Sequence, residues 1–282
     1  GNGKTLVLID QEGGRVQRLR PPHWPDYPAM RPFGEKARTN PEEAAECVRL
    51  NYRLIAADLA ALGINVDCAP VLDLPIEGSH EIIGDRAFSN DPDCVARLGQ
   101  AVCDGLLRGG VLPVIKHIPG HGRAFSDSHQ ELPRVDTPLD ELRLTDFAPF
   151  RELSGAPAGM TAHIVYSAID ADGPGSASPL VVGETIRGEI GFDGLLFSDD
   201  VCMKALSGPL GQRVASVLAA GCDIALHCDG NFADMAAIAE TCPPMRPDSL
   251  ARLNSATALM HDSDDFDPEP AKRRISAFLG SG

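Results

Sequence analysis

The residues best suited to chemistry lie in one stretch, residues 112–133, where three histidines, a lysine and an aspartate follow an apolar run. The apolar run predicts a buried strand, at whose end Lys116 and His117 would stand. A proline and two glycines then break regular structure, and a polar loop carries Asp127 and His129. Enzymes of parallel α/β architecture place their chemistry at strand ends. We therefore expect an active site here.

Asp127 and His129 are separated by a single serine, so the carboxylate could orient the imidazole and raise its basicity. Such a pair, working with a nucleophile from elsewhere in the chain, could donate a proton and later accept one. A histidine in a loop is commonly no more than a solvated side chain, so the motif alone is weak. The pair is a candidate acid/base unit that needs a nucleophile beside it.

Asp199 is the candidate nucleophile. It follows a second apolar run, residues 194–197, and is adjacent to Asp200. A carboxylate at such a strand end can attack a sugar carbon or stabilise an oxocarbenium-like transition state. It could instead cap the following helix. Two adjacent aspartates satisfy both needs if Asp200 is the cap and Asp199 faces the site.

Other polar side chains could bind a substrate or a metal. Asp10, Arg18 and Arg86 have donors and acceptors suited to sugar hydroxyls, although surface ion pairs would use the same residues. Lys116 and His117 could equally form a strand-end salt bridge and a packed imidazole. The histidines at positions 117 and 121 would need a helix to share a metal, and the Pro-Gly pair between them prevents one. We therefore expect no metal site there.

The elements that would position these residues alternate along the chain as strands and helices. Apolar strands are expected at residues 5–9, 64–74, 112–115, 158–165, 194–197 and 223–226. Helices are expected at residues 40–63, 91–110, 138–154, 179–191, 212–220, 231–241 and 248–260. The first two helices each have an Asn or Asp cap, a proline at the first helical position and a glycine stop. Solidly apolar strands indicate a parallel sheet covered on both faces.

Polar residues end nearly all of the strands. They are Asp10, Asp73, Lys116 with His117, His163, Asp199 and His227. Convergence from many strand ends on one mouth is typical of a barrel. We therefore predict an α/β protein of (β/α)8 TIM-barrel type, a single domain over residues 1–282 that lacks its first two strand–helix units in this chain. Residues 262–282 would form an acidic C-terminal tail.

The composition argues against several classes of partner and indicates a cellular compartment. The net charge of −15 argues against nucleic-acid or anionic-membrane partners, because both favour a basic face. The eight cysteines include no C-x-x-C pair and indicate reduced thiols in a cytoplasmic protein. No apolar run reaches the length of about 20 residues that a membrane-spanning helix needs. No signal peptide is visible, although the chain begins without Met.

Four motifs give a family resemblance. They are Ile-Asp-Gln-Glu-Gly-Gly-Arg-Val-Gln-Arg (9–18), Lys-His-Ile-Pro-Gly-His-Gly (116–122), Asp-Ser-His (127–129) and Ser-Asp-Asp-Val-Cys-Met (198–203). In this order they resemble family 3 glycoside hydrolases, most closely the bacterial single-domain β-N-acetylhexosaminidases of NagZ type. Each motif is modest by itself, but together they are specific and span nearly the whole chain.

The resemblance implies a retaining β-N-acetylglucosaminidase. Asp199 matches the nucleophile that forms a glycosyl-enzyme intermediate, His129 matches the general acid/base on a flexible loop, and Asp127 matches its partner. The residues that match those holding the N-acetylglucosamine unit are Asp10, Arg18, Arg86, Lys116 and His117. The implied substrates are N-acetylglucosaminyl-anhydromuramoyl peptides, small carbohydrates handled in cytosolic cell-wall recycling. No cofactor or metal is implied.

The chain departs from the family pattern at a few positions. Ile118 stands where the family commonly has Phe, and Arg123 and Phe125 lie in the acid/base loop, residues 120–130. The N-terminal segment that is typical of the family is also not seen in this sequence. None of these departures touches a matched catalytic position.

Three other functions compete with this interpretation. A family 3 β-glucosidase or β-xylosidase would generally take its acid/base carboxylate from an additional domain, for which this chain has no room. A metal-dependent barrel hydrolase would use the histidines at 117, 121, 163 and 227. A non-catalytic sugar-binding barrel would have no need of Asp199 or of the Asp127–His129 pair.

Overall fold

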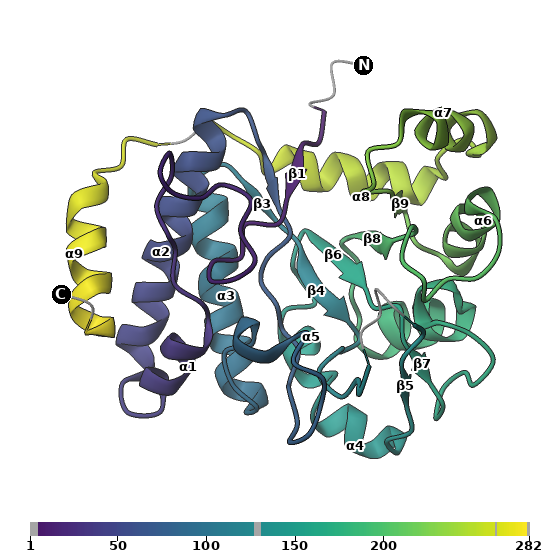
Figure 1. The fold of residues 1–282 in the computed structure, drawn as a ribbon, viewed down its shortest axis with the longest axis horizontal. Coiled ribbons are helices and arrows are strands. Elements are labelled where there is room, and N and C mark those ends of the chain that lie inside the picture. The colour runs from purple at the N-terminus through teal and green to yellow at the C-terminus, as the bar shows by residue number, and fades with distance from the viewer. Residues whose placement is uncertain (1–4, 127–130, 263, 281–282) are drawn as a thin grey trace.

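The computed structural model describes residues 5–126, 131–262 and 264–280, in which parallel strands lie side by side in chain order (Figure 1). One sheet runs β1 (Leu8–Ile9), β2 (Val66–Asp67), β3 (Leu112–Pro113), and another runs β4 (Ile115–Ile118), β6 (Ala158–Thr161), β8 (Leu195–Asp200), β9 (Ile224–Leu226). Only Val114 separates β3 from β4, and a parallel bridge between Val71 and Lys116 joins the two sheets. The result is one parallel ladder of six strand positions, which confirms the predicted barrel-type fold.

Successive strand residues face two different apolar clusters. Leu196 of β8 packs with the helices that surround the sheet, whereas Leu195 and Phe197 pack on the opposite, inner side. Met160 of β6 belongs to this inner cluster as well. Both faces are buried, so the strands are apolar throughout rather than alternating, as the sequence indicated.

The two longest helices begin where the sequence predicts. In α2 (Pro41–Ala61) the Asn40 side chain accepts a hydrogen bond from the Glu43 backbone N–H, and in α3 (Pro92–Arg108) Asp91 caps in the same manner. The two helices pack closely, because a Cβ on Gly105 would lie 2.4 Å from the Arg49 carbonyl oxygen. A side chain at this position would therefore force α2 and α3 apart.

The remaining helices follow the strands around the sheet. They are α1 (Arg31–Ala37), α4 (Leu139–Leu144), α5 (Ala148–Glu152), η3 (Leu180–Glu189), α6 (Leu210–Ala220), α7 (Phe232–Thr241) and α8 (Pro247–Ala258). Short elements fill the loops: η1 (Gly84–Arg86), η2 (Gly175–Ala177) and the pair β5 (Arg134–Val135) with β7 (Val165–Tyr166). The single helix expected at 138–154 is thus two short helices. Across the described ranges, none of the helices has both the length and the apolar character needed to cross a membrane.

The C-terminal segment, residues 262–282, contains a helix that was not predicted. This helix, α9 (Pro268–Leu279), runs alongside α2 at the edge of the molecule (Figure 1). Ala271 and Ile275 are buried against the core, and the Arg274 guanidinium pairs with Glu43 at 2.6 and 2.7 Å. The segment is so highly charged that its short apolar stripe does not stand out in the sequence. The helix can be recognised only from its packing against α2.

Candidate active site

A cavity of about 730 Å³ opens at the C-terminal ends of the strands. Each of four strands sends a polar residue to its wall: Asp10 after β1, Lys116 from β4, Asp199 from β8 and His227 after β9. The lining also includes the other three predicted sugar-binding residues, Arg18, Arg86 and His117. The fold therefore brings together all the predicted site residues that the structure describes. Asp127 and His129 lie outside the described residues.

Asp199 is half-buried on the cavity wall. It lies within the last residues of β8 rather than after the strand, and its Oδ1 accepts a hydrogen bond from the Asp200 backbone N–H at 2.8 Å. Burial alone would raise the pKa of Asp199, but the imidazoles of His163 and His117 outweigh burial and lower it below its usual value. The carboxylate is therefore ionised near neutral pH, as a nucleophile requires.

Asp200 does not cap the next helix, so that expectation was wrong. Helix α6 starts only at Leu210, and its N-cap is Pro209. The Asp200 Oδ1 instead accepts hydrogen bonds from the backbone N–H groups of Cys202 at 3.0 Å and Cys228 at 3.1 Å. Asp200 thereby ties together the loops that follow β8 and β9, directly beside Asp199.

Lys116 is held in place by two carboxylates. Its Nζ lies 3.0 Å from Asp10 Oδ1 and 2.5 Å from Glu12 Oε1, and both Lys116 and Glu12 are only 2% exposed. Glu12 also forms a two-point ion pair with Arg86, at 2.8 Å for each contact. Burial would raise the pKa of Glu12, but Lys116 and Arg86 lower it to about 2. At the outer end, Arg18 pairs with Asp10 Oδ2 at 3.0 Å.

Glu12 is a residue that the sequence analysis missed. It orients two predicted sugar-binding cations, and the signal for it was an acidic residue two positions after Asp10 at the same strand end. The glycine pair that follows also behaves as expected, since Gly13 has a φ of 91°. A Cβ there would lie 2.4 Å from the Pro28 carbonyl oxygen. The glycine pair therefore lets residues 27–29 pack directly against the turn that follows β1.

Asp73 fixes the orientation of His117. The Asp73 Oδ2 is 2.7 Å from His117 Nδ1, and Oδ1 accepts hydrogen bonds from the backbone N–H groups of His117 and His121. With Nδ1–H donating to a carboxylate, the Nε2 lone pair of His117 is the one left for other partners. Burial would raise the pKa of Asp73, but the two histidines lower it to about 2. The sequence analysis noted Asp73 only as a polar strand end.

Replacing Asp73 with asparagine should weaken the protein's resistance to acid unfolding in a defined range. Because the folded-state pKa of Asp73 is about 2 against an ordinary value of 3.8, its stabilising effect is complete above pH 3.8 and is lost as the pH falls toward 2. We expect a loss of about 2 kcal/mol in the free energy of unfolding at pH 5, shrinking toward pH 2. Urea unfolding from pH 5 to pH 2 measures this. Asp104→Asn, on the exposed face of α3, is the control; equal losses in both variants would contradict the assignment.

His163 does not act as a metal ligand in this arrangement. Its side chain is fully buried, its Nε2 is 3.0 Å from the Asp200 carbonyl oxygen, and its Nδ1 is 2.6 Å from Ser176 Oγ. Burial lowers the pKa of His163, so near pH 7 the ring is neutral, with Nε2–H donating to the carbonyl and Nδ1 accepting from the hydroxyl. Both nitrogens are occupied. The metal hydrolase that would need His163 together with His117, whose Nδ1 is taken by Asp73, loses its support.

Arg123 anchors the chain just before the segment that carries the candidate acid/base. Its guanidinium pairs with Asp146 at 2.6 Å and with Glu141 at 2.8 Å. His121, two residues earlier, lines the cavity, and burial together with repulsion from His117 lowers its pKa to about 4. The chain therefore leaves the cavity wall at 121 and is fixed at 123, which is six residues before position 129.

Comparison with known proteins gives consistent matches. Residues 4–246 match the model of the glycosyl hydrolase family 3 N-terminal domain. A β-hexosaminidase of Thiobacillus denitrificans is 38% identical over 280 residues, covering 98% of this chain and 71% of that protein. One from Chromobacterium violaceum is 39% identical over 252 residues, covering 88% and 70%.

Solved structures of family 3 enzymes match this chain as well. NagZ from Neisseria gonorrhoeae, in complex with N-trifluoroacetyl-D-glucosamine, superposes with a TM-score of 0.83 at 32% identity, covering 98% of this chain and 81% of that one. A family 3 β-N-acetylglucosaminidase from Paenibacillus gives a TM-score of 0.84 at 29% identity. This chain is 97% covered in that match but spans only 55% of the Paenibacillus chain.

Proposed function

The chain belongs to glycoside hydrolase family 3 and is a glycosidase of the β-hexosaminidase class, and from this premise we propose that it releases terminal β-linked N-acetylglucosamine by a retaining mechanism. The observation that carries the proposal is the ionised carboxylate of Asp199 on the wall of a cavity large enough for a sugar. The same wall carries Asp10, Lys116 and His117, which suit sugar hydroxyls and an acetamido group. The whole of residues 1–282 would act as one catalytic domain.

The proposed reaction proceeds in two steps. In the first, an Asp199 oxygen bonds to the anomeric carbon while the glycosidic C–O bond breaks and protonated His129 gives its proton to the departing oxygen. In the second, water attacks the glycosyl–Asp199 ester as His129 takes a proton from it, and the sugar leaves with its original configuration. Asp127 would orient His129. Neither step uses a cofactor or a metal ion.

The charged residues that line the cavity together with Asp199 would bind and orient the sugar. Glu12 holds Lys116 and Arg86 rigidly, so their positive charges are in place before a substrate arrives. Arg18 is different, because its side chain is 63% exposed and is tied only to Asp10 among the described residues. Arg18 therefore suits the outer part of a substrate, while Lys116 and His117 suit the buried sugar ring.

The proposed natural substrates are N-acetylglucosaminyl-anhydromuramoyl fragments, with or without peptide, in cytoplasmic peptidoglycan recycling. Support for an N-acyl sugar comes from the N-trifluoroacetyl-D-glucosamine bound by the Neisseria protein. The eight cysteines are free thiols, which suits a reducing compartment. The strongly acidic character of the chain suits a small carbohydrate partner rather than nucleic acid or an anionic membrane.

Hydrolysis of aryl β-N-acetylglucosaminide against aryl β-glucoside tests the sugar specificity. We expect kcat/KM to favour the N-acetylglucosaminide by about 100-fold or more, because polar groups placed for an acetamido group are left unpaired by a hydroxyl. Aryl β-xyloside is a second comparison. Equal or higher activity on the glucoside or the xyloside would favour a β-glucosidase or β-xylosidase instead.

A further inference from the structure

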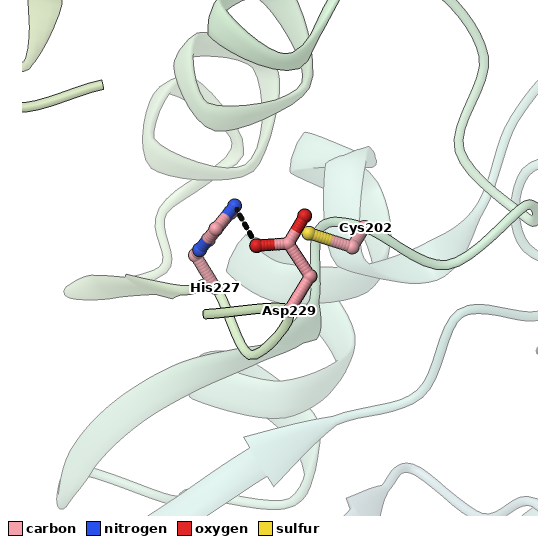
Figure 2. Close-up of side chains that lie close together, drawn as sticks. All are labelled: Cys202, His227 and Asp229. Carbon is pink, nitrogen blue, oxygen red and sulfur yellow. Dashed lines mark ion pairs between the residues drawn. The ribbon is translucent and has the colours of Figure 1, made fainter. Parts of the chain in front are cut away.

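Three potential metal ligands meet where the loops after β8 and β9 approach one another (Figure 2). Cys202 comes from the first loop, and His227 and Asp229 come from the second. One ligand atom from each side chain lies within 4.8 Å of the other two. In the part of the chain that the structure describes, no other group of side chains has the spacing of metal ligands. The histidines at 117, 121 and 163 do not belong to the group.

The geometry within the group suits a shared ion better than a direct contact. His227 Nε2 and Asp229 Oδ1 are 3.1 Å apart, yet the pair does not have the angles of a hydrogen bond. In a tetrahedral zinc site with bonds of about 2.0 Å, a nitrogen and an oxygen ligand are about 3.3 Å apart. The observed separation is therefore close to that of two ligands bound to one ion, with the thiol of Cys202 beside them.

The buried side chain of His227 also lacks hydrogen-bond partners among the described residues. Its side chain is only 9% exposed, and neither ring nitrogen has a hydrogen-bond partner among the described residues. Leaving a buried polar group unpaired destabilises the folded state. A bound cation would satisfy one nitrogen directly, which gives a physical reason for burying an imidazole at this point.

Hydrogen bonds fix the two loops that carry the ligands, and two of the three ligands are at least partly exposed to solvent. Asp200 accepts hydrogen bonds from the backbone of both Cys202 and Cys228, so the two loops are fixed relative to each other. Asp229 is exposed and Cys202 is partly exposed, so an ion can reach the group from solvent. His227 and Asp200 line the active-site cavity, which places the group at its rim.

We propose that Cys202, His227 and Asp229 bind one divalent transition-metal ion of the zinc class at the rim of the cavity. A thiolate, an imidazole and a carboxylate together favour zinc over magnesium or calcium, which prefer oxygen ligands alone. On binding, the Cys202 thiol gives its proton to solvent, and water occupies the fourth position. The ion fastens the loops after β8 and β9 next to Asp199. This site is separate from the proposed hydrolysis, which needs no metal.

Metal binding by the full chain, after chelator treatment and dialysis, tests the proposal directly. Zinc titrated against a chromophoric competitor should bind tightly at one equivalent, and the melting temperature should rise, because the ion binds the folded state. Cobalt(II) should give a thiolate-to-metal charge-transfer absorption that is lost in Cys202→Ser. The same variant and His227→Ala should each weaken zinc binding at least about 100-fold, since even second-shell changes cost 10–100-fold.

Matched variants separate this site from other zinc-binding groups. Cys242→Ser removes an exposed thiol elsewhere and should keep full affinity and the cobalt band. His129→Ala should also keep both, because its histidine belongs to the proposed hydrolytic pair and not to this group. Each variant is first compared with the parent in chelator by circular dichroism, so that misfolding is recognised. Unchanged binding by Cys202→Ser, no cobalt–thiolate band in the parent, or loss of binding in His129→Ala alone would overturn the proposal.

Discussion

Replacing Asp199 with asparagine is expected to lower kcat for aryl β-N-acetylglucosaminides by at least about 10⁴-fold. Asparagine keeps the shape of the side chain and can still accept the hydrogen bond from the Asp200 backbone, so the fold should not change. It removes the negative charge that attacks the anomeric carbon. Steady-state kinetics with a nitrophenyl glycoside measures the loss, and binding of N-acetylglucosamine by calorimetry should change little.

The chemical role of Asp199 can be separated from a structural one. In Asp199→Ala the missing side chain leaves room for azide, which should restore turnover and release the glycosyl azide with inverted configuration. Asp248→Asn, the isosteric change at an exposed position of α8, should leave kcat unchanged. If Asp199→Asn kept more than about one per cent of activity, the nucleophile would have to be another residue.

Replacing His129 with alanine is expected to lower kcat/KM, which reports the first step, by about 10²–10⁴-fold on substrates whose leaving group needs a proton. A dinitrophenyl group leaves readily as an anion, so its release should be much less affected. Plotting log kcat/KM against the leaving-group pKa should therefore give a steep slope for the variant and a shallow one for the parent. This expectation comes from the Asp-Ser-His motif and the family resemblance.

His261→Ala provides the matched control, because that histidine is exposed near the end of the chain and far from position 129 in sequence. It should keep the parent's rate and slope. A uniform loss across all leaving groups in His129→Ala would mean that the residue positions the substrate rather than transferring a proton. The acid/base assignment would then pass to another residue, while the Asp199 result would still stand.

The sequence alone was enough to predict the elements whose signals are local. The starts of α2 and α3 were correct because a cap, a proline and the first apolar turn lie within a few residues of each other. The barrel type followed from apolar strands alternating with helices. The polar strand ends, including Asp10, Lys116 and Asp199, were correctly expected to converge because parallel units place their carboxyl ends at one mouth.

The tertiary structure decided which side chains pair with which. Glu12 holds Arg86 across 74 residues, Lys116 reaches Asp10 across 106, and Asp73 orients His117 across 44. Such partners share no sequence period and no fixed spacing, because the sheet register and the path of each loop bring them together. The same holds for α9, whose weak apolar stripe has meaning only against α2.

Asp200 and the metal-ligand group also show the difference between what the sequence predicts and what the tertiary structure decides. Two adjacent aspartates at a strand end were visible in the sequence, but which one served as a structural tie depended on where the loop after β9 passes. Cys202 and His227 are 25 positions apart in the chain and meet only because β8 and β9 are neighbouring strands. Sequence fixes residue types and local geometry, whereas contacts between distant residues depend on the packing of the whole chain.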